Sequence, residues 1–161
     1  MDRPRTPAQQ YSLLAGAFLL ALGVLSLVIA QPGFGTATQT PGHTFLIWNA
    51  NGWDCIAWLV FGGLGLAMAV KASTARLYSV ISGVFFAVVA IWGFINGYYA
   101  FNLMSLGIVD NITHAVIGGL GLLVAALPKS LDSMLRMFRS LKTNSMKRFR
   151  QHKTFLLCPR L

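Results

Sequence analysis

A sixteen-residue segment occurs twice in this chain, and the repetition constrains the fold more than any other feature. The first copy, DCIAWLVFGGLGLAMA, runs from Asp54 to Ala69, and the second, DNITHAVIGGLGLLVA, runs from Asp110 to Ala125. The segment before each copy matches too: Tyr11, Ser12, Gly16 and Phe18 correspond to Tyr78, Ser79, Gly83 and Phe85. The sequence therefore predicts a two-helix hairpin written twice in tandem.

Four apolar segments are long enough to cross a bilayer, and we place these spans at residues 11–30, 53–70, 77–97 and 111–127. At about 1.5 Å per residue the first covers roughly the 30 Å of a hydrocarbon core. Only 11% of the residues are charged, against about 25% in soluble domains. We predict an all-α integral membrane protein, a bundle of four transmembrane helices. A cleaved signal peptide ending at Val28-x-Ala30 is the alternative for the first span, but the apolar run is longer than such peptides carry.

The basic residues predict the orientation. Arg3 and Arg5 precede the first span, Lys71 and Arg76 lie between the second and third, and a basic tail follows the fourth. The other two connections contain no Lys or Arg, so the positive-inside rule puts both termini in the cytoplasm. We expect the protein in the plasma membrane. We divide the chain into a cytoplasmic N-terminus (1–10), a membrane domain (11–127) and a basic tail (128–161).

Each repeat contains a GGLG motif inside an apolar span. Lipid offers no hydrophobic drive between helices, so association depends on close backbone approach, which glycine allows. We expect these glycines to mark where the second and fourth spans pack together as an inner pair; a hinge or cavity wall is the alternative. The residues concerned are Gly62, Gly63, Gly65, Gly118, Gly119 and Gly121.

The aspartates that open the two copies allow two interpretations. Asp54 and Asp110 can be N-caps, because a helix N-terminus presents unpaired N–H groups and a partial positive charge. Alternatively, His114 lies one turn beyond Asp110 on the same face, and an outer-side polar site of Asp54, Asp110, Asn111 and His114 would bind a proton, a cation or a polar ligand. The first copy has Trp58 in place of His114, so the repeat does not supply a symmetric site.

Catalysis, a metal and a cofactor find little support. A metal centre needs three or four ligands, and only His43, in the first outer loop, adds to the aspartates and His114. No nucleophile–base arrangement has consistent sidedness, and Cys55 lies among apolar residues, which favours an unreactive thiol. We therefore expect no catalytic residue, no metal and no cofactor.

The tail from Leu131 combines an apolar stripe with basic residues, which is typical of a helix lying on the cytoplasmic leaflet. Anionic lipid is the expected partner, at about 1 kcal/mol for each basic residue near the surface. A disordered, solvated tail is the alternative, and nucleic acid is not expected because phosphate attraction alone is unspecific. The basic residues are Arg136, Arg139, Lys142, Lys147, Arg148 and Arg150.

The chain has four spans and an Asp-Asn-x-x-His pattern before a Gly-rich helix. In this it resembles domain-of-unknown-function family 4383, whose members are small four-helix membrane proteins found mostly in actinobacteria. In that family the second and fourth helices open with (His/Asp)-Asn-x-x-His leading to Gly-x-x-Gly. The fourth span matches through Asp110, Asn111 and His114, whereas Cys55 and Trp58 depart from the pattern in the second. The resemblance covers roughly residues 11–127 and implies the four-helix fold, but no activity.

Our leading hypothesis is a non-enzymatic auxiliary or scaffolding subunit of a membrane assembly, associating with other membrane proteins or with itself. The alternative is a small transporter or channel-like protein with its polar site at Asp110 and His114. A membrane enzyme or redox subunit using His114 is the least supported.

Overall fold

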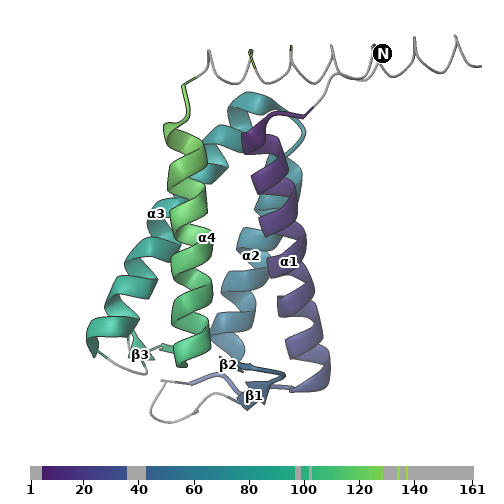
Figure 1. The fold of residues 1–161 in the computed structure, drawn as a ribbon. Helices are drawn as coiled ribbons and strands as arrows, with labels where there is room; N and C mark the ends of the chain where they lie inside the picture. Colours follow the sequence, from purple (N-terminus) through teal and green to yellow (C-terminus); the bar gives the residue numbers. More distant parts are fainter. Residues whose placement is uncertain are drawn as a thin grey trace, which may run out of the picture. The chain divides into compact units, whose positions relative to one another are not determined.

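The computed structural model describes residues 5–35, 43–96, 99–101, 103–128, 134 and 137. A compact unit, Pro7–Ala126, holds four helices and two short β-hairpins (Figure 1). The helices are α1 (Pro7–Ile29), α2 (Gly52–Met68), α3 (Ala72–Asn96) and α4 (Ile108–Ala126). The strands are β1 (His43–Phe45), β2 (Trp48–Ala50), β3 (Tyr99–Ala100) and β4 (Met104–Ser105).

The four-helix prediction is confirmed. Three helices, α1, α3 and α4, are long and apolar enough to cross a membrane, and α2 is a shorter apolar helix of 17 residues. The helix α3 begins five residues before the predicted span, at Ala72. Arg76 lies in this added stretch, and its guanidinium donates to the carbonyl oxygen of Ala125 (2.7 Å) in the last turn of α4.

The helices associate in two pairs. In the first half of the unit, α1 packs along α2, and in the second half, α3 packs along α4 (Figure 1). Between the halves, α1 meets α3, and the α1–α4 and α2–α3 contacts are sparser. Our expectation that the second and fourth spans form the inner pair is wrong, because α2 and α4 barely touch.

The GGLG glycines explain this pairing, since they lie against the preceding helix rather than against each other. A Cβ on Gly65 would come within 3 Å of the Cα of Gly16, and one on Gly121 within 3 Å of the Cα of Gly83. Backbones that approach this closely leave no room for a side chain. The α1–α2 and α3–α4 contacts are therefore built from glycine on both sides.

The middle glycine of each motif behaves differently. A Cβ on Gly63 or on Gly119 would meet no atom within 4 Å, whereas one on Gly62 would strike the backbone of Leu20 and one on Gly118 the backbone of Ala87. Within the part of the chain that the structure describes, Gly63 and Gly119 therefore have no packing role.

Two tyrosines join the halves through backbone carbonyls. The Tyr11 hydroxyl donates to the carbonyl oxygen of Ile117 in α4 (2.9 Å), and the Tyr78 hydroxyl donates to that of Phe61 in α2 (3.0 Å). Both tyrosine side chains are buried. Each hydroxyl thus finds an acceptor on the helix of the other half, as a buried phenol requires.

The two β-hairpins lie at the end of the unit where α2 and α4 begin, which we call the β-hairpin end. Strands β1 and β2 pair antiparallel, as do β3 and β4. The apolar residues Leu46 and Ile47 form the turn between β1 and β2. Leu46 and Ile47 are 73% and 61% exposed. The indole N–H of Trp48 donates to Thr113 Oγ1 in α4 (3.1 Å).

A candidate functional site at the β-hairpin end

Asp54 accepts hydrogen bonds from both halves of the unit. Its Oδ2 accepts the backbone N–H of Asn51 (2.9 Å), just before α2, and the backbone N–H of Ser105 (3.1 Å), in strand β4 of the second half. The side chain is 1% exposed. A carboxylate buried with two N–H donors is a satisfied acceptor, so this oxygen is committed to the fold.

Asp110 makes the reciprocal arrangement. Its Oδ2 accepts the N–H of Gly107 (2.8 Å), just before α4, and the N–H of Asn49 (3.0 Å), in strand β2 of the first half. Asn49 and Ser105 occupy equivalent positions of the two copies, fifty-six residues apart. The two aspartates therefore fasten each β-hairpin to the helix of the other half.

The N-cap interpretation of the aspartates needs correction. The N-cap of α2 is Asn51, whose Oδ1 accepts the N–H groups of Trp53 and Asp54, and Asp54 completes a capping box from the N3 position. Asp110 likewise lies in the first turn of α4 rather than before it. Both aspartates still lie where the helix dipole favours a negative group, but their bonds to the other half go beyond capping.

Asn51 is a site residue that our sequence interpretation missed. Besides capping α2, its Nδ2 donates to the carbonyl oxygen of Leu103 in the second half. The pattern Asn51-x-x-Asp54 before an apolar run is a recognisable capping-box sequence. The capping bond was therefore readable from the sequence, although the bond to Leu103 was not.

His114 is buried on α4 and lies against α3. It is 2% exposed, and its ring stacks on Phe86 with centroids 5.3 Å apart and planes 19° apart. Among the residues that the structure describes, its Nδ1 has no hydrogen-bond partner, and neither has Oδ1 of Asp110. The spacing predicted that these two side chains share a face, but no hydrogen bond joins those atoms.

Asn111 adds a third buried acceptor, its Oδ1, which has no partner within the described part of the chain. Its amide lies where a Cβ on Gly93 would be. At the matching place in the first half, Cys55 Sγ donates to Ser26 Oγ (3.3 Å). The larger Asn111 is thus accommodated by the smaller Gly93, and the smaller Cys55 is matched by Ser26.

The arrangement offers three acceptor atoms within about one turn of α4: Asp110 Oδ1, Asn111 Oδ1 and His114 Nδ1. Buried acceptors without a donor are costly, at about 1–3 kcal/mol each, so this turn is where a polar ligand or a water molecule would be stabilised. Among the residues that the structure describes, no three His, Cys, Asp or Glu side chains come close enough to hold a metal ion.

Comparison with known proteins places the chain in a family. The model of the family described as domain of unknown function (DUF4383) matches residues 9–127, which is most of the chain; the match contains α2, α3 and α4 and all of α1 after its first two residues. No curated protein and no solved structure matches. The match includes Asp110, Asn111 and His114, the residues on which the resemblance rests. The chain therefore belongs to the DUF4383 family, and its membership confirms the family suggested by the sequence.

Proposed function

We propose that the chain is a non-enzymatic auxiliary or scaffolding subunit of a plasma-membrane assembly. The family and the three membrane-length helices fit a membrane protein. The proposal includes a fourth crossing by α2, a tandem duplication of the helix pair, and both termini in the cytoplasm, which the positive-inside rule supports. In this orientation the β-hairpin end faces outward.

The observation that carries the proposal is a pair of exposed helix glycines, Gly63 and Gly119. Glycine in a helix costs about 1 kcal/mol relative to alanine, and none of the residues that the structure describes needs the missing side chain at Gly63 or Gly119. Both positions are exposed, one on α2 and one on α4. Close approach of another transmembrane helix is what such a position serves in lipid.

Extraction in a mild detergent followed by native mass measurement tests the proposal. We expect the chain in a complex larger than one molecule, and we expect Gly63→Leu with Gly119→Leu to release it as a monomer. Ala21→Leu is the matched control, since Ala21 is an exposed small residue on α1. A native protein that is monomeric, or complexes lost equally in the control, would count against a scaffolding role.

The partnerless acceptors on α4 support a second candidate, a small transporter or channel-like protein with an outer-side site at Asp110 and His114. Vesicles that contain the purified chain and a pH-sensitive dye provide the test. Proton or cation flux above that of empty vesicles, abolished by His114→Phe in a folded protein, would favour this candidate. Flux equal to that of empty vesicles would reject it for these ions.

The basic tail is proposed to bind anionic lipid; its basic residues from Arg136 to Arg150 lie outside the described residues. Co-sedimentation of a tail peptide with anionic and with neutral vesicles tests this part. Binding that requires anionic lipid and weakens with salt supports it, and equal binding to both vesicles opposes it.

A further inference from the structure

Helices α2 and α4 are shorter than the helices that precede them. Helix α2 has 17 residues against 23 in α1, and α4 has 19 against 25 in α3, so each is about 9 Å shorter than its partner at 1.5 Å per residue. Their lengths, about 26 and 28 Å, also fall short of the roughly 30 Å hydrocarbon core of a bilayer. In a bilayer that α1 and α3 cross, the segments that continue α2 and α4 therefore lie at membrane depth.

The missing length falls at the β-hairpin end, because the helix ends lie together at the opposite end. There, the Gln9 side chain near the start of α1 donates to the carbonyl oxygen of Ala69 at the end of α2 (3.1 Å). Arg76, near the start of α3, donates in the same way to Ala125 at the end of α4 (2.7 Å). Strand β2 leads directly into α2, and β4 into α4. The two β-hairpins therefore occupy the depth that the short helices leave.

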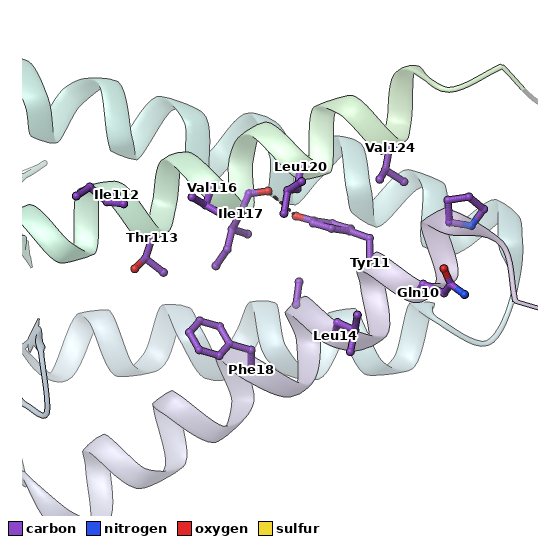
Figure 2. Close-up of a pocket in the computed structure, with 12 residues that line it drawn as sticks. Gln10, Tyr11, Leu14, Phe18, Ile112, Thr113, Val116, Ile117, Leu120 and Val124 are labelled. Atoms are coloured by element: carbon purple, nitrogen blue, oxygen red, sulfur yellow. Dashed lines mark hydrogen bonds between the residues drawn. The ribbon is translucent and has the colours of Figure 1, made fainter.

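The first β-hairpin lies back against the helices. The Trp48 indole donates to Thr113 Oγ1 (3.1 Å), in the second turn of α4, and its ring lies edge-on to Phe18 of α1 with centroids 6.0 Å apart. Figure 2 shows Phe18 and Thr113 on facing sides of the space between α1 and α4. The turn of Leu46 and Ile47, directly before Trp48, is thereby held near the surface of the bundle.

The second β-hairpin continues an apolar face of α3. The ring of Phe101 stacks on Trp92, with centroids 5.1 Å apart and planes 29° apart, and Trp92 lies about one turn before α3 ends. Val88 and Ile95 share this helical face and are exposed. Phe101 thus adds a ring to the apolar outer face of a helix long enough to cross a membrane, at the depth of Trp92.

Both turns hold large apolar residues in a backbone conformation that does not suit them. Leu46 and Phe101 have φ angles of 56° and 54°, in the left-handed region where glycine and asparagine are the usual residues. Their side chains are exposed, as are those of Ile47 and Leu103. Exposed apolar side chains at strained turns gain nothing in water, but they are stabilised where the surroundings are apolar.

The segments that contain the β-hairpins suit lipid in two further respects. Residues 31–53 and 97–109 contain no Asp, Glu, Lys or Arg, and charge is what makes entry into a bilayer costly. Backbone N–H groups at membrane depth need acceptors within the protein. The carboxylates of Asp54 and Asp110 supply them to Ser105 and Asn49.

We propose that the turns of both β-hairpins bind the lipid of the leaflet at their end, at the boundary between headgroups and acyl chains. Leu46 and Ile47 from the first turn, and Phe101 and Leu103 from the second, insert among the acyl chains. Because this surface is uncharged, phosphatidylcholine suffices as its partner, in contrast to the anionic lipid proposed for the basic tail. The inference rests on the membrane crossing in the proposed function, but not on the scaffolding role.

Spin labelling of the full chain in phosphatidylcholine vesicles tests the proposal. Leu46→Cys and Phe101→Cys, each combined with Cys158→Ser, carry a nitroxide at one turn. Cys55 is buried, and Cys158→Ser alone measures any label that Cys55 takes up. The collision rate of each nitroxide is measured with oxygen, which dissolves in the bilayer, and with a water-soluble nickel chelate.

Two reference positions calibrate the ratio of the oxygen rate to the nickel rate. Val84→Cys is exposed at the middle of α3, and Lys71→Cys is exposed in the connection between α2 and α3. We expect the ratio at Leu46 and Phe101 to be several-fold higher than at Lys71 and lower than at Val84, as at an interfacial depth.

A ratio at both turns equal to that at Lys71, with Val84 in lipid, overturns the proposal and leaves the membrane crossing intact. Low collision rates with both reagents also overturn it, because protein then covers the turns. A ratio at Val84 no higher than at Lys71 refutes the membrane crossing itself. Ile47→Cys and Leu103→Cys are the second pair of positions if the first pair does not fold, and a thermal melt establishes folding.

Discussion

Asp54 accepts a backbone N–H from the second half, and Asp110 accepts one from the first. The donors, Ser105 and Asn49, lie 3.1 and 3.0 Å from the respective Oδ2 atoms. Two carboxylates that would otherwise cap only their own helices therefore form a reciprocal brace across the β-hairpin end. The two repeated aspartates therefore stabilise the fold through this brace.

Removing either carboxylate should weaken the whole unit. We expect Asp54→Ala and Asp110→Ala each to lower the free energy of unfolding by about 2–5 kcal/mol, because each removes two hydrogen bonds to a carboxylate oxygen. Denaturant titration in detergent micelles measures the loss. The double variant should lose less than the sum, since both residues fasten the same β-hairpins.

Asn96→Ala is the control for this series, because Asn96 is exposed and, among the described residues, its amide donates only to the carbonyl oxygen of Trp92 in its own helix. Its effect should stay within about 0.5 kcal/mol. Strictly additive losses for the two aspartates would contradict a shared brace.

Neighbouring glycines should respond oppositely to the same substitution. Gly62→Ala places a Cβ against the backbone of Leu20 and should cost about 1–3 kcal/mol. Gly63→Ala meets nothing and should stabilise the isolated chain by up to about 1 kcal/mol. Melting of the monomer in detergent distinguishes them, and Gly118→Ala with Gly119→Ala should repeat the result. Equal effects at Gly62 and Gly63 would refute the assigned packing.

The Asn111–Gly93 contact should be exchangeable for its counterpart in the first half. Gly93→Ser alone places an atom in the volume of the Asn111 amide and should lower stability by about 1–3 kcal/mol. Adding Asn111→Cys recreates the Ser26–Cys55 pair and should recover most of the loss. Unfolding of the native chain, the single variant and the double variant forms the comparison. A double variant less stable than Gly93→Ser would show that the two sites are not equivalent.

His114→Phe distinguishes a structural from a functional histidine. The ring stacks on Phe86, and phenylalanine keeps that stacking while removing the partnerless Nδ1. We expect the variant to be as stable as the native chain or more stable, by up to about 1–3 kcal/mol, as read by thermal melting. A clear loss of stability would mean that Nδ1 has a bound partner in the membrane.

Much of the fold could be predicted because it depends on local pattern. The apolar runs around Leu22 and Val89 are long enough to require helices in lipid, and all four helices were found. Helix ends were less accurate: α3 begins five residues before the predicted span, because a helix need not end where its apolar run ends, here at the charged residue Arg76.

The partners of the repeated residues could not be predicted. The sequence gives Gly65 a reason to pack closely but does not say whether α1 or α4 receives it, and the structure pairs it with Gly16. Likewise, Asp54 is readable as a helix-start residue, but its bond to Ser105 depends on how the two β-hairpins meet. Contacts between segments about fifty residues apart are decided by the whole bundle.

The division of contacts between and within halves has a consequence for biogenesis. The closest backbone approaches, such as Gly16 to Gly65, lie inside a half, and α2 is followed by only three residues before α3 begins. Chains are released from the ribosome N-terminus first and fold as units, so α1 and α2 can assemble before the second half is synthesised. Ser105 and Asp110 are synthesised after these helices, so the brace can close only once this part of the second half is present.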